Sequence, residues 1–173
     1  MSERFFCEAV PTAGRAVLSG DEARHLAKVL RARVGDAVTL FAGDGRSWPA
    51  RILRIDRREV ELETDPPVPQ PAASGPAVTL AVALPKGERQ KWLVEKLTEL
   101  GAARLVPLVT ERGVAEATAG AVERMQRGVI EACKQCGRNR LMEIGPPATL
   151  AEVVASKPAT ALGVVADPSG GPL

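Results

Sequence analysis

Four charged side chains in the second half of the chain follow apolar segments that are typical of buried strands: Lys86, Arg89, Glu111 and Arg112. Lys86 and Arg89 flank Gly87, which would let a ligand approach the backbone closely. Such a loop at the start of a helix suits a phosphate group. An ordinary solvated loop is the competing interpretation, and the sequence does not match the Walker A pattern of nucleoside triphosphatases. These residues therefore indicate either an anion-binding site or a surface loop.

A second charged region lies between residues 124 and 140, where five basic residues stand against one acidic residue. The whole chain has a net charge of only +2, so any attraction to a polyanion must be local. Such a run is typical of a solvated helix face as well as of an RNA surface. In the first half, Arg31 and Arg33 could contact RNA phosphates or interact with the end of a helix. His25, the single histidine, is more typical of a structural than of a catalytic residue.

The three cysteines do not predict a disulfide framework or a metal site. Cys133 and Cys136 form a C-K-Q-C motif near the end of an expected helix, whereas the redox pair of thioredoxins opens one. A structural zinc site needs about four ligands, and the chain has one histidine. Three unevenly spaced thiols fit a reducing compartment. We therefore expect no metal.

The composition is that of a globular protein, with 173 residues, 45% hydrophobic and 25% charged. No apolar run approaches the ~20 residues of a membrane span, and the N-terminus lacks the apolar core of a signal peptide. We therefore expect a soluble, cytoplasmic protein without membrane contact. Because the chain has three Phe, two Trp and no Tyr, phosphate and shape contacts are expected to outweigh an extensive base-stacking platform in any RNA complex.

A proline-rich segment divides the chain. Residues 65–76 contain five prolines, which favour an extended, semi-rigid spacer. We place the domain boundary there. The expected organisation is a first domain at 1–65, a linker at 66–76 and a second domain at 77–173.

Short strands and one helix are predicted in the first domain. The strands are expected at 5–9, 16–18, 37–41, 48–55 and 60–63, with a hairpin turn at 43–45. A capping box at Ser19 and Glu22 begins the helix. Its apolar residues then recur at helical spacing: Leu26, Val29 and Leu30. This pattern predicts a small, partly closed β-barrel.

Strands and helices alternate in the second domain, which predicts a mostly parallel sheet covered by helices. Strands are expected at 78–84, 104–109 and 161–166, and helices at 88–100, 121–136 and after a capping box at Thr149 and Glu152. The nearly apolar segment 78–84 should be buried on both faces. Gly101 and Gly137 should end the two long helices. The first helix is expected to bury Leu93, Val94, Leu97 and Leu100.

Several segments, in order, resemble the family of 16S ribosomal RNA uridine-N3 methyltransferases. They are Arg4-Phe5, HLAKVLRARVGD at 25–36, LPKGERQKWLVEKLTELG at 84–101, TERG at 110–113 and EACKQCGRNR at 131–140. The resemblance spans nearly the whole chain, and the third and fifth segments at this separation are its most specific part. It also explains the cysteine pair as family sequence rather than a redox device.

The resemblance implies a two-domain protein in which a small PUA-like, RNA-binding β-barrel precedes an α/β SPOUT-type domain with a parallel sheet and a trefoil knot. It implies S-adenosylmethionine as cofactor, 16S rRNA of the small ribosomal subunit as substrate, and a homodimer for the full-length protein. In that reaction Lys86, Arg89 and Arg112 would position the RNA or stabilise the deprotonated uracil, and Glu111 is the candidate base. Its candidate RNA-contacting residues are Arg4, His25, Arg31, Arg33, Lys134, Gln135 and Arg138.

The sequence also departs from the family pattern. The family's GPEGG and L-G-x-R-I-L-R-x-E-T-A segments, which form the knot and hold the cofactor, have no counterpart here. We therefore assign no cofactor-binding residue and expect an incomplete methyltransferase domain that is inactive by itself. Two alternatives stay open: an RNA-binding module without catalysis, and a phosphate- or nucleotide-binding α/β protein that uses the loop at 86–89.

Overall fold

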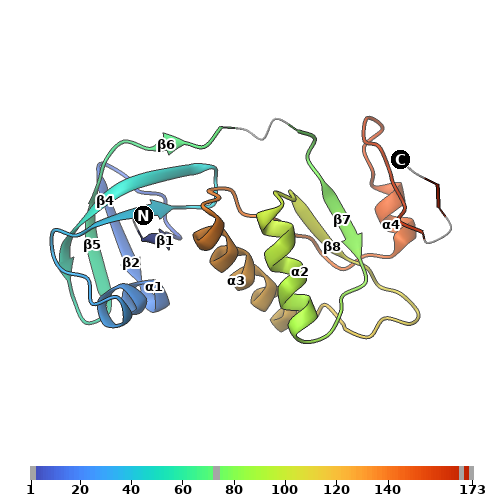
Figure 1. Cartoon of the computed structure of the whole chain (residues 1–173), viewed down its shortest axis with the longest axis horizontal. Coiled ribbons are helices and arrows are strands. Elements are labelled where there is room, and N and C mark those ends of the chain that lie inside the picture. The colour runs from blue at the N-terminus through green and yellow to red at the C-terminus, as the bar shows by residue number, and fades with distance from the viewer. Residues whose placement is uncertain (1–2, 72–74, 168–169, 172–173) are drawn as a thin grey trace.

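The first half of the molecule is built on a six-stranded sheet (Figure 1). The computed structural model describes residues 3–71, 75–167 and 170–171, so residues 72–74 of the predicted linker lie outside the described residues. The elements of this half are β1 (Arg4–Phe6), β2 (Arg15–Ser19), α1 (Gly20–Arg24), the π-helix η1 (His25–Val29), β3 (Ala37–Phe41), β4 (Arg46–Ile55), β5 (Glu59–Thr64) and β6 (Val68–Pro69). The strand order is β1-β3-β4-β5-β2, with β6 paired to β4. β1 and β3 run parallel, and the other described pairs are antiparallel.

Alternating side chains explain why these segments form strands. In β2 and β5 every second residue is buried, as in Leu18, Val60 and Leu62, and the residues between them face outward. This period of two is typical of antiparallel strands with one buried face. The five strands predicted in this half form, and β3 has the predicted bounds, but the strand predicted at 5–9 is β1, which ends at Phe6. The first core contains Phe5, Leu18, Leu26, Leu40, Trp48, Ile52, Val60 and Leu62.

The helix that follows β2 differs from the prediction in two respects. The side chain of Ser19 makes no capping hydrogen bond, so the predicted capping box is wrong. Leu26 is fully buried, but Val29 and Leu30 are 65% and 38% exposed. The reason is the change from α1 to η1, in which the amide of Leu30 donates to the carbonyl of His25, five residues earlier. This wider turn shifts the following side chains around the axis, so α-helical spacing no longer selects the buried face.

The second half is a three-stranded parallel sheet with helices packed against it (Figure 1). Its elements are β7 (Thr79–Val82), α2 (Glu88–Glu99), β8 (Arg104–Pro107), α3 (Ala119–Cys136), β9 (Glu143–Ile144) and α4 (Leu150–Ala155). α3 lies between the first sheet and α2 (Figure 1). The second core contains Phe41, Leu84, Val94, Leu105, Met125, Val129, Cys133 and Met142. The predicted change from an antiparallel to a parallel architecture is confirmed.

In this half one predicted strand forms without its predicted burial, and another does not form. The segment predicted as doubly buried forms β7, an edge strand that is at most half-buried, and Val78 before it is 52% exposed. The predicted strand at 161–166 does not form, and Leu162 is 87% exposed. β9 occupies the position beside β8 instead, because the amide of Gly145 donates to the carbonyl of Leu105 and this pairing uses the open edge of β8. The sequence analysis chose residues 161–166 as the strand because this segment is longer and more apolar than the two residues of β9.

Glycines in the left-handed conformation end both long helices, as predicted. Gly101 (φ 85°) donates its amide to Thr98, and Gly137 (φ 78°) donates its amide to Cys133. Leu100, by contrast, is 83% exposed rather than buried. The buried face of α2 is centred on Val94 and Thr98, and Leu100 lies about 200° around the helix axis from Thr98.

Of the two predicted capping boxes, only the one at Thr149 and Glu152 is present in the structure. Thr149 accepts the amide of Glu152, and the Glu152 carboxylate accepts the amide of Thr149, which is a complete capping box. We expect Thr149→Ala to speed hydrogen exchange of α4 amides roughly fivefold, the effect of ~1 kcal/mol lost with an N-cap. Ser19→Ala, the matched control, should leave exchange in α1 unchanged. Equal effects in both helices, read by mass spectrometry, would contradict this assignment.

Candidate functional site

The carboxyl ends of β7 and β8 bring two loops to the same edge of the second sheet (Figure 1). The loop from β7 into α2 carries Lys86 and Arg89, and the loop after β8 carries Glu111 and Arg112. All four residues are exposed. We call Lys86, Arg89 and Arg112 the basic edge. The parallel pairing of β7 and β8 thus places the two loops that carry these four residues at one edge of the sheet.

Gly87 fixes the backbone of the first loop. It precedes α2 with φ 62°, and its carbonyl accepts the amide of Gln90 at 3.0 Å. Open space surrounds its Cα, since a Cβ placed there would have no heavy atom within 4 Å. The unpaired amides and partial positive charge of a helix N-terminus add to the charges of Lys86 and Arg89. The loop therefore suits an anion that approaches from solvent.

The cations of the basic edge are available to an external ligand. The ion pairs of the part of the chain that the structure describes involve other residues, so Lys86, Arg89 and Arg112 have no carboxylate partner there. Glu111 lies in the same turn as Arg112, which the amide of Gly113 closes by donating to Thr110. An exposed set of three cations and one carboxylate can bind a large polyanion and hold a proton acceptor close to it.

Arg4, a predicted RNA-contacting residue, makes contacts that connect the two halves of the molecule. Its guanidinium lies over the ring of Phe41, 5.0 Å from the centroid, and donates hydrogen bonds to the Asn139 side chain and the Arg138 carbonyl. Burial lowers the pKa of Arg4. Phe41 ends β3 of the first sheet but belongs to the second core. Arg4 therefore stabilises the contact between the two halves. We call this contact region, around Arg4, Phe41 and Asn139, the junction.

The glycine turn between β3 and β4 completes the junction. The amide of Gly45 donates to Asn139 at 3.0 Å, and the amide of Leu141 donates to Gly43 at 3.1 Å. A Cβ on Gly43 would lie 2.6 Å from Cγ of Leu141, so a side chain has no room at that position. Gln70, within the predicted linker, accepts the amide of Asn139 at 2.7 Å. The proline-rich segment is thus attached to both halves through β6 and Gln70.

Two further predicted RNA-contacting residues make contacts within the protein. Lys134 on α3 pairs with Glu22 on α1 at 2.9 Å, and its side chain is only 10% exposed. Burial, the largest single influence, lowers the pKa of Lys134, but hydrogen bonds and charge attraction from Glu22 and Glu131 together outweigh it, so that the pKa is raised. Arg138 donates to the carbonyl of Thr98 at 3.1 Å, close to the end of α2. Their predicted contacts with RNA stay predictions.

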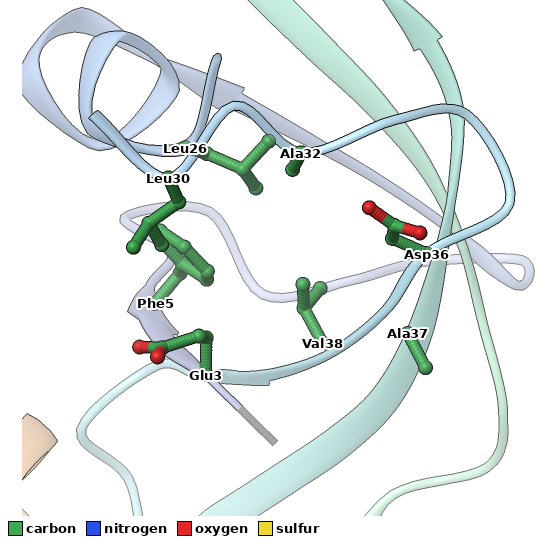
Figure 2. A pocket seen from close by; sticks show the side chains of 8 residues that line it. All are labelled: Glu3, Phe5, Leu26, Leu30, Ala32, Asp36, Ala37 and Val38. Atoms are coloured by element: carbon green, nitrogen blue, oxygen red, sulfur yellow. The ribbon is translucent and has the colours of Figure 1, made fainter. Parts of the chain in front are cut away.

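The remaining predicted RNA-contacting residues are exposed: His25, Arg31, Arg33 and Gln135. A pocket of about 360 Å³, which Figure 2 shows from close by, lies near the end of η1. The pocket is lined by Glu3, Phe5, Leu26, Leu30, Ala32, Asp36, Ala37 and Val38. The His25 ring packs edge-on against Phe5, with 6.2 Å between centroids, as expected of a structural histidine. Arg31 and Arg33 are exposed on either side of Ala32, which lines the pocket, and both could contact a polyanion from solvent.

The cysteines are free, and Cys7 and Cys133 are buried whereas Cys136 is exposed. Burial raises the pKa of Cys133 to about 11 and also raises that of Cys7. Within residues 3–71, 75–167 and 170–171, no cluster of His, Cys, Asp or Glu could hold a metal ion. No helix of the same residues is long and apolar enough to cross a membrane.

Sequence reasoning missed the polar residues of the junction. Asn139 is buried and bonded to both halves, yet the sequence analysis gave it no role. Gln70 was assigned to a spacer, and Glu22 to a helix cap. Two features of the sequence could have indicated this junction: the segment at 131–140 and the glycine pair in the turn at 43–45. Two glycines on either side of one residue often mark a position where another backbone approaches closely.

The second prediction tests the close contact at Gly43. Gly43 and Gly35 both have positive φ, 82° and 95°, but only Gly43 faces another side chain. Gly35→Ala should lower the free energy of unfolding by about 1–2 kcal/mol through backbone strain alone. Gly43→Ala should lower the free energy of unfolding by about 1–3 kcal/mol more than Gly35→Ala does, because the added methyl group overlaps Leu141. Urea unfolding measures both, and equal losses would refute a tight junction.

The third prediction concerns thiol reactivity. At neutral pH Cys133 remains a thiol because its pKa is raised, whereas Cys136 is accessible to reagents. Iodoacetamide should therefore modify one cysteine quickly in the native protein, and mass spectrometry should locate the adduct on Cys136. Cys136→Ser should abolish the rapid reaction. Rapid native labelling of Cys133 would contradict its burial.

Comparison with known proteins identifies two family models in the sequence. The RNA methyltransferase PUA domain matches residues 18–65, and the RNA methyltransferase domain matches residues 73–172, which is more than half of the chain. Ribosomal RNA small subunit methyltransferase E of Synechocystis sp. is 32% identical over 143 residues, 79% of this chain and 45% of that protein. The chain spans about half the length of the curated relatives it matches.

Solved structures support the same assignment. A methyltransferase from Legionella pneumophila in complex with bound SAM is 30% identical, with a TM-score of 0.83 over 91% of this chain and 67% of that one. Ribosomal RNA small subunit methyltransferase E from Neisseria gonorrhoeae, bound to S-adenosyl methionine, is 27% identical, with a TM-score of 0.82 over 92% and 67%. The fold is accordingly a PUA-like half-barrel followed by a methyltransferase domain. The chain belongs to the RNA methyltransferase family, with the PUA domain before the methyltransferase domain.

Proposed function

We propose that this protein acts in the S-adenosylmethionine-dependent methylation of 16S rRNA at N3 of a uridine, and that its described residues bind and position the RNA. The observation that carries the proposal is the basic edge, where three exposed cations without carboxylate partners follow parallel strands of a methyltransferase domain. Ligands of open parallel sheets bind at this edge, because the helix N-termini point there. Exposed cations suit the phosphate groups of a large RNA.

The chemistry of the reaction assigns roles to the same residues. Uridine carries a proton on N3, and its removal leaves negative charge on the uracil ring. Lys86, Arg89 and Arg112 would stabilise that charge and hold the neighbouring phosphates. Glu111, in the turn beside Arg112, is the proposed proton acceptor. Positioning of the uridine is the larger contribution that these residues would make.

A second contact with RNA is proposed on the PUA-like half-barrel. Arg31 and Arg33 are exposed near the pocket at the end of η1, and His25 is exposed beside them. Arg33 donates its backbone amide to Asp36 at 2.7 Å, which fixes the loop and leaves its guanidinium directed to solvent. Two basic surfaces on one chain would bind RNA at separate points and thereby set its orientation.

S-adenosylmethionine supplies the methyl group in this reaction, but the described residues do not fit it by themselves. The residues at the carboxyl edge, Lys86, Arg89, Glu111 and Arg112, are all exposed. A small cofactor is normally held in a cleft that covers most of its surface. We therefore derive no step through the cofactor. The trefoil knot, the homodimer and the cytoplasmic location that the resemblance implies belong to the same proposal.

The alternative is an RNA-binding module without catalysis, which the exposure of the carboxyl edge favours. Calorimetric titration of residues 1–173 with S-adenosylmethionine separates the two functions. RNA binding without cofactor binding would support the module. Saturable binding of the cofactor would support catalysis and contradict the expected inactivity of the chain.

The fourth prediction is that the basic edge determines RNA affinity. Binding of fluorescein-labelled 16S rRNA fragments should weaken as salt increases, with a log–log slope of about 0.7–0.9 per neutralised phosphate. Lys86→Ala/Arg89→Ala should weaken binding and reduce this slope by roughly 1–2. The control, Arg57→Ala/Arg58→Ala, removes two exposed cations from the turn between β4 and β5 and should leave binding unchanged. Equal losses in both variants would contradict a local site.

A further inference from the structure

Trp92 is the one aromatic residue whose side chain is mostly exposed to solvent. Its exposure is 61%, whereas Phe5, Phe41 and Trp48 are between 0% and 3% exposed. Phe6 is half-buried and packs edge-on against Phe41. All five aromatic residues are among the described residues. Packing in the core therefore does not explain why an indole stands at this position of α2.

The helix itself directs Trp92 away from the protein. Val94 and Thr98 mark the buried face of α2, and Trp92 lies about 200° around the axis from Val94. Its neighbours one turn away on the helix surface are all charged: Glu88, Arg89, Glu95 and Lys96. An apolar protein partner would meet charged groups on every side of the ring. This surrounding argues against a hydrophobic docking surface.

The charges around Trp92 are unequally distributed. On the C-terminal side Lys96 pairs with Glu95 and with Glu99, the latter at 2.7 Å, so its charge is balanced. On the N-terminal side Arg89 lies one turn from Trp92 and has no ion pair within the described part of the chain. Lys86 and Lys91 are also exposed near that end of α2. Glu88 is the exposed carboxylate at the same end, so Lys86, Arg89 and Lys91 leave a net positive charge in the direction of the basic edge.

We propose that Trp92 stacks on an unpaired base of the RNA whose phosphates lie on the basic edge. The inference rests on the proposed RNA-binding function and adds a preference for single-stranded RNA. Every base has a π-face, so an exposed indole can stack on it without reading the sequence, while neighbouring cations hold the backbone. The base adjacent to a uridine that is turned out of its helix would be unstacked and available.

Tryptophan fluorescence provides a direct test. Trp48 is 3% exposed and lies in the first core, so it supplies a constant background. Titration of the full chain with a single-stranded oligoribonucleotide should quench the emission of Trp92. A duplex of the same length should bind through its phosphates and quench much less. Trp92→Phe should remove the change in emission yet bind single-stranded RNA within about threefold of the wild type, because a smaller ring still stacks.

Trp92→Leu removes the π-system and should weaken binding of single-stranded RNA about fivefold or more, in the range expected for the loss of one stacked base. The salt slope should stay unchanged, whereas Lys86→Ala/Arg89→Ala lowers it. Leu100→Ala is the matched control, since it removes another exposed apolar side chain of α2 and should leave RNA binding unchanged. Circular dichroism should show folded protein for each variant, as expected for exposed positions.

The outcomes separate this inference from the proposed function. Unchanged affinity of Trp92→Leu for single-stranded RNA, with wild-type binding intact, would overturn the role of Trp92 alone. Absence of RNA binding by the wild type would overturn the proposed function and this inference with it. Sedimentation that shows a wild-type dimer and a Trp92→Leu monomer would overturn the inference in favour of self-association.

Discussion

The arrangement of the molecule depends on one half-buried cation. Arg4 of β1 lies over Phe41 and donates hydrogen bonds to the segment after α3, so it connects the first sheet to the second core. A guanidinium removed from water loses hydration, and its neighbours must compensate with a ring face and carbonyl oxygens. Lys134 and Glu22 form a second polar link between the same halves. These contacts bring α3 against the sheet of the half-barrel rather than leaving the halves tethered by a spacer.

A rigid junction has a functional consequence. The basic edge and the loop that carries Arg31 and Arg33 belong to different halves, and a flexible linker would let them move independently. The glycine turn, Gln70 and Asn139 connect the halves by hydrogen bonds, which would restrict changes in the separation of the two basic surfaces. An RNA that contacts both surfaces must have a matching shape. The net charge of the chain is only +2, so general attraction to a polyanion is weak and two local basic surfaces would have to provide the binding.

Local patterns predicted most of the fold, and non-local contacts account for what they missed. Alternating residues located β2 to β5, and Gly137 located the end of α3. β9 was missed because two residues carry little periodicity and its position depends on the open edge of β8. The exposed side of η1 was mispredicted because a π-helix changes the spacing of side chains. For the candidate site, the alternation of strands and helices sufficed to predict that the loops after β7 and β8 share one edge of the sheet.

The roles of Arg4 and Lys134 could not be predicted in the same way. A basic residue in a charged run has the same appearance in the sequence whether it faces solvent or an internal carboxylate. Their partners, Asn139 and Glu22, lie more than 100 positions away in the chain. The resemblance assigned Lys134 and Arg138 to RNA contact, and it gave no indication that the segment at 131–140 also builds the junction.

Photocrosslinking of 4-thiouridine-labelled 16S rRNA fragments to the protein, followed by mass spectrometric mapping, tests the central claim most directly. We expect crosslinks in peptides that contain residues 84–92 and 110–113, and further crosslinks in a peptide that contains residues 25–33. Crosslinks confined to the turn between β4 and β5, or spread evenly over the surface, would contradict an RNA site at the carboxyl edge of the second sheet.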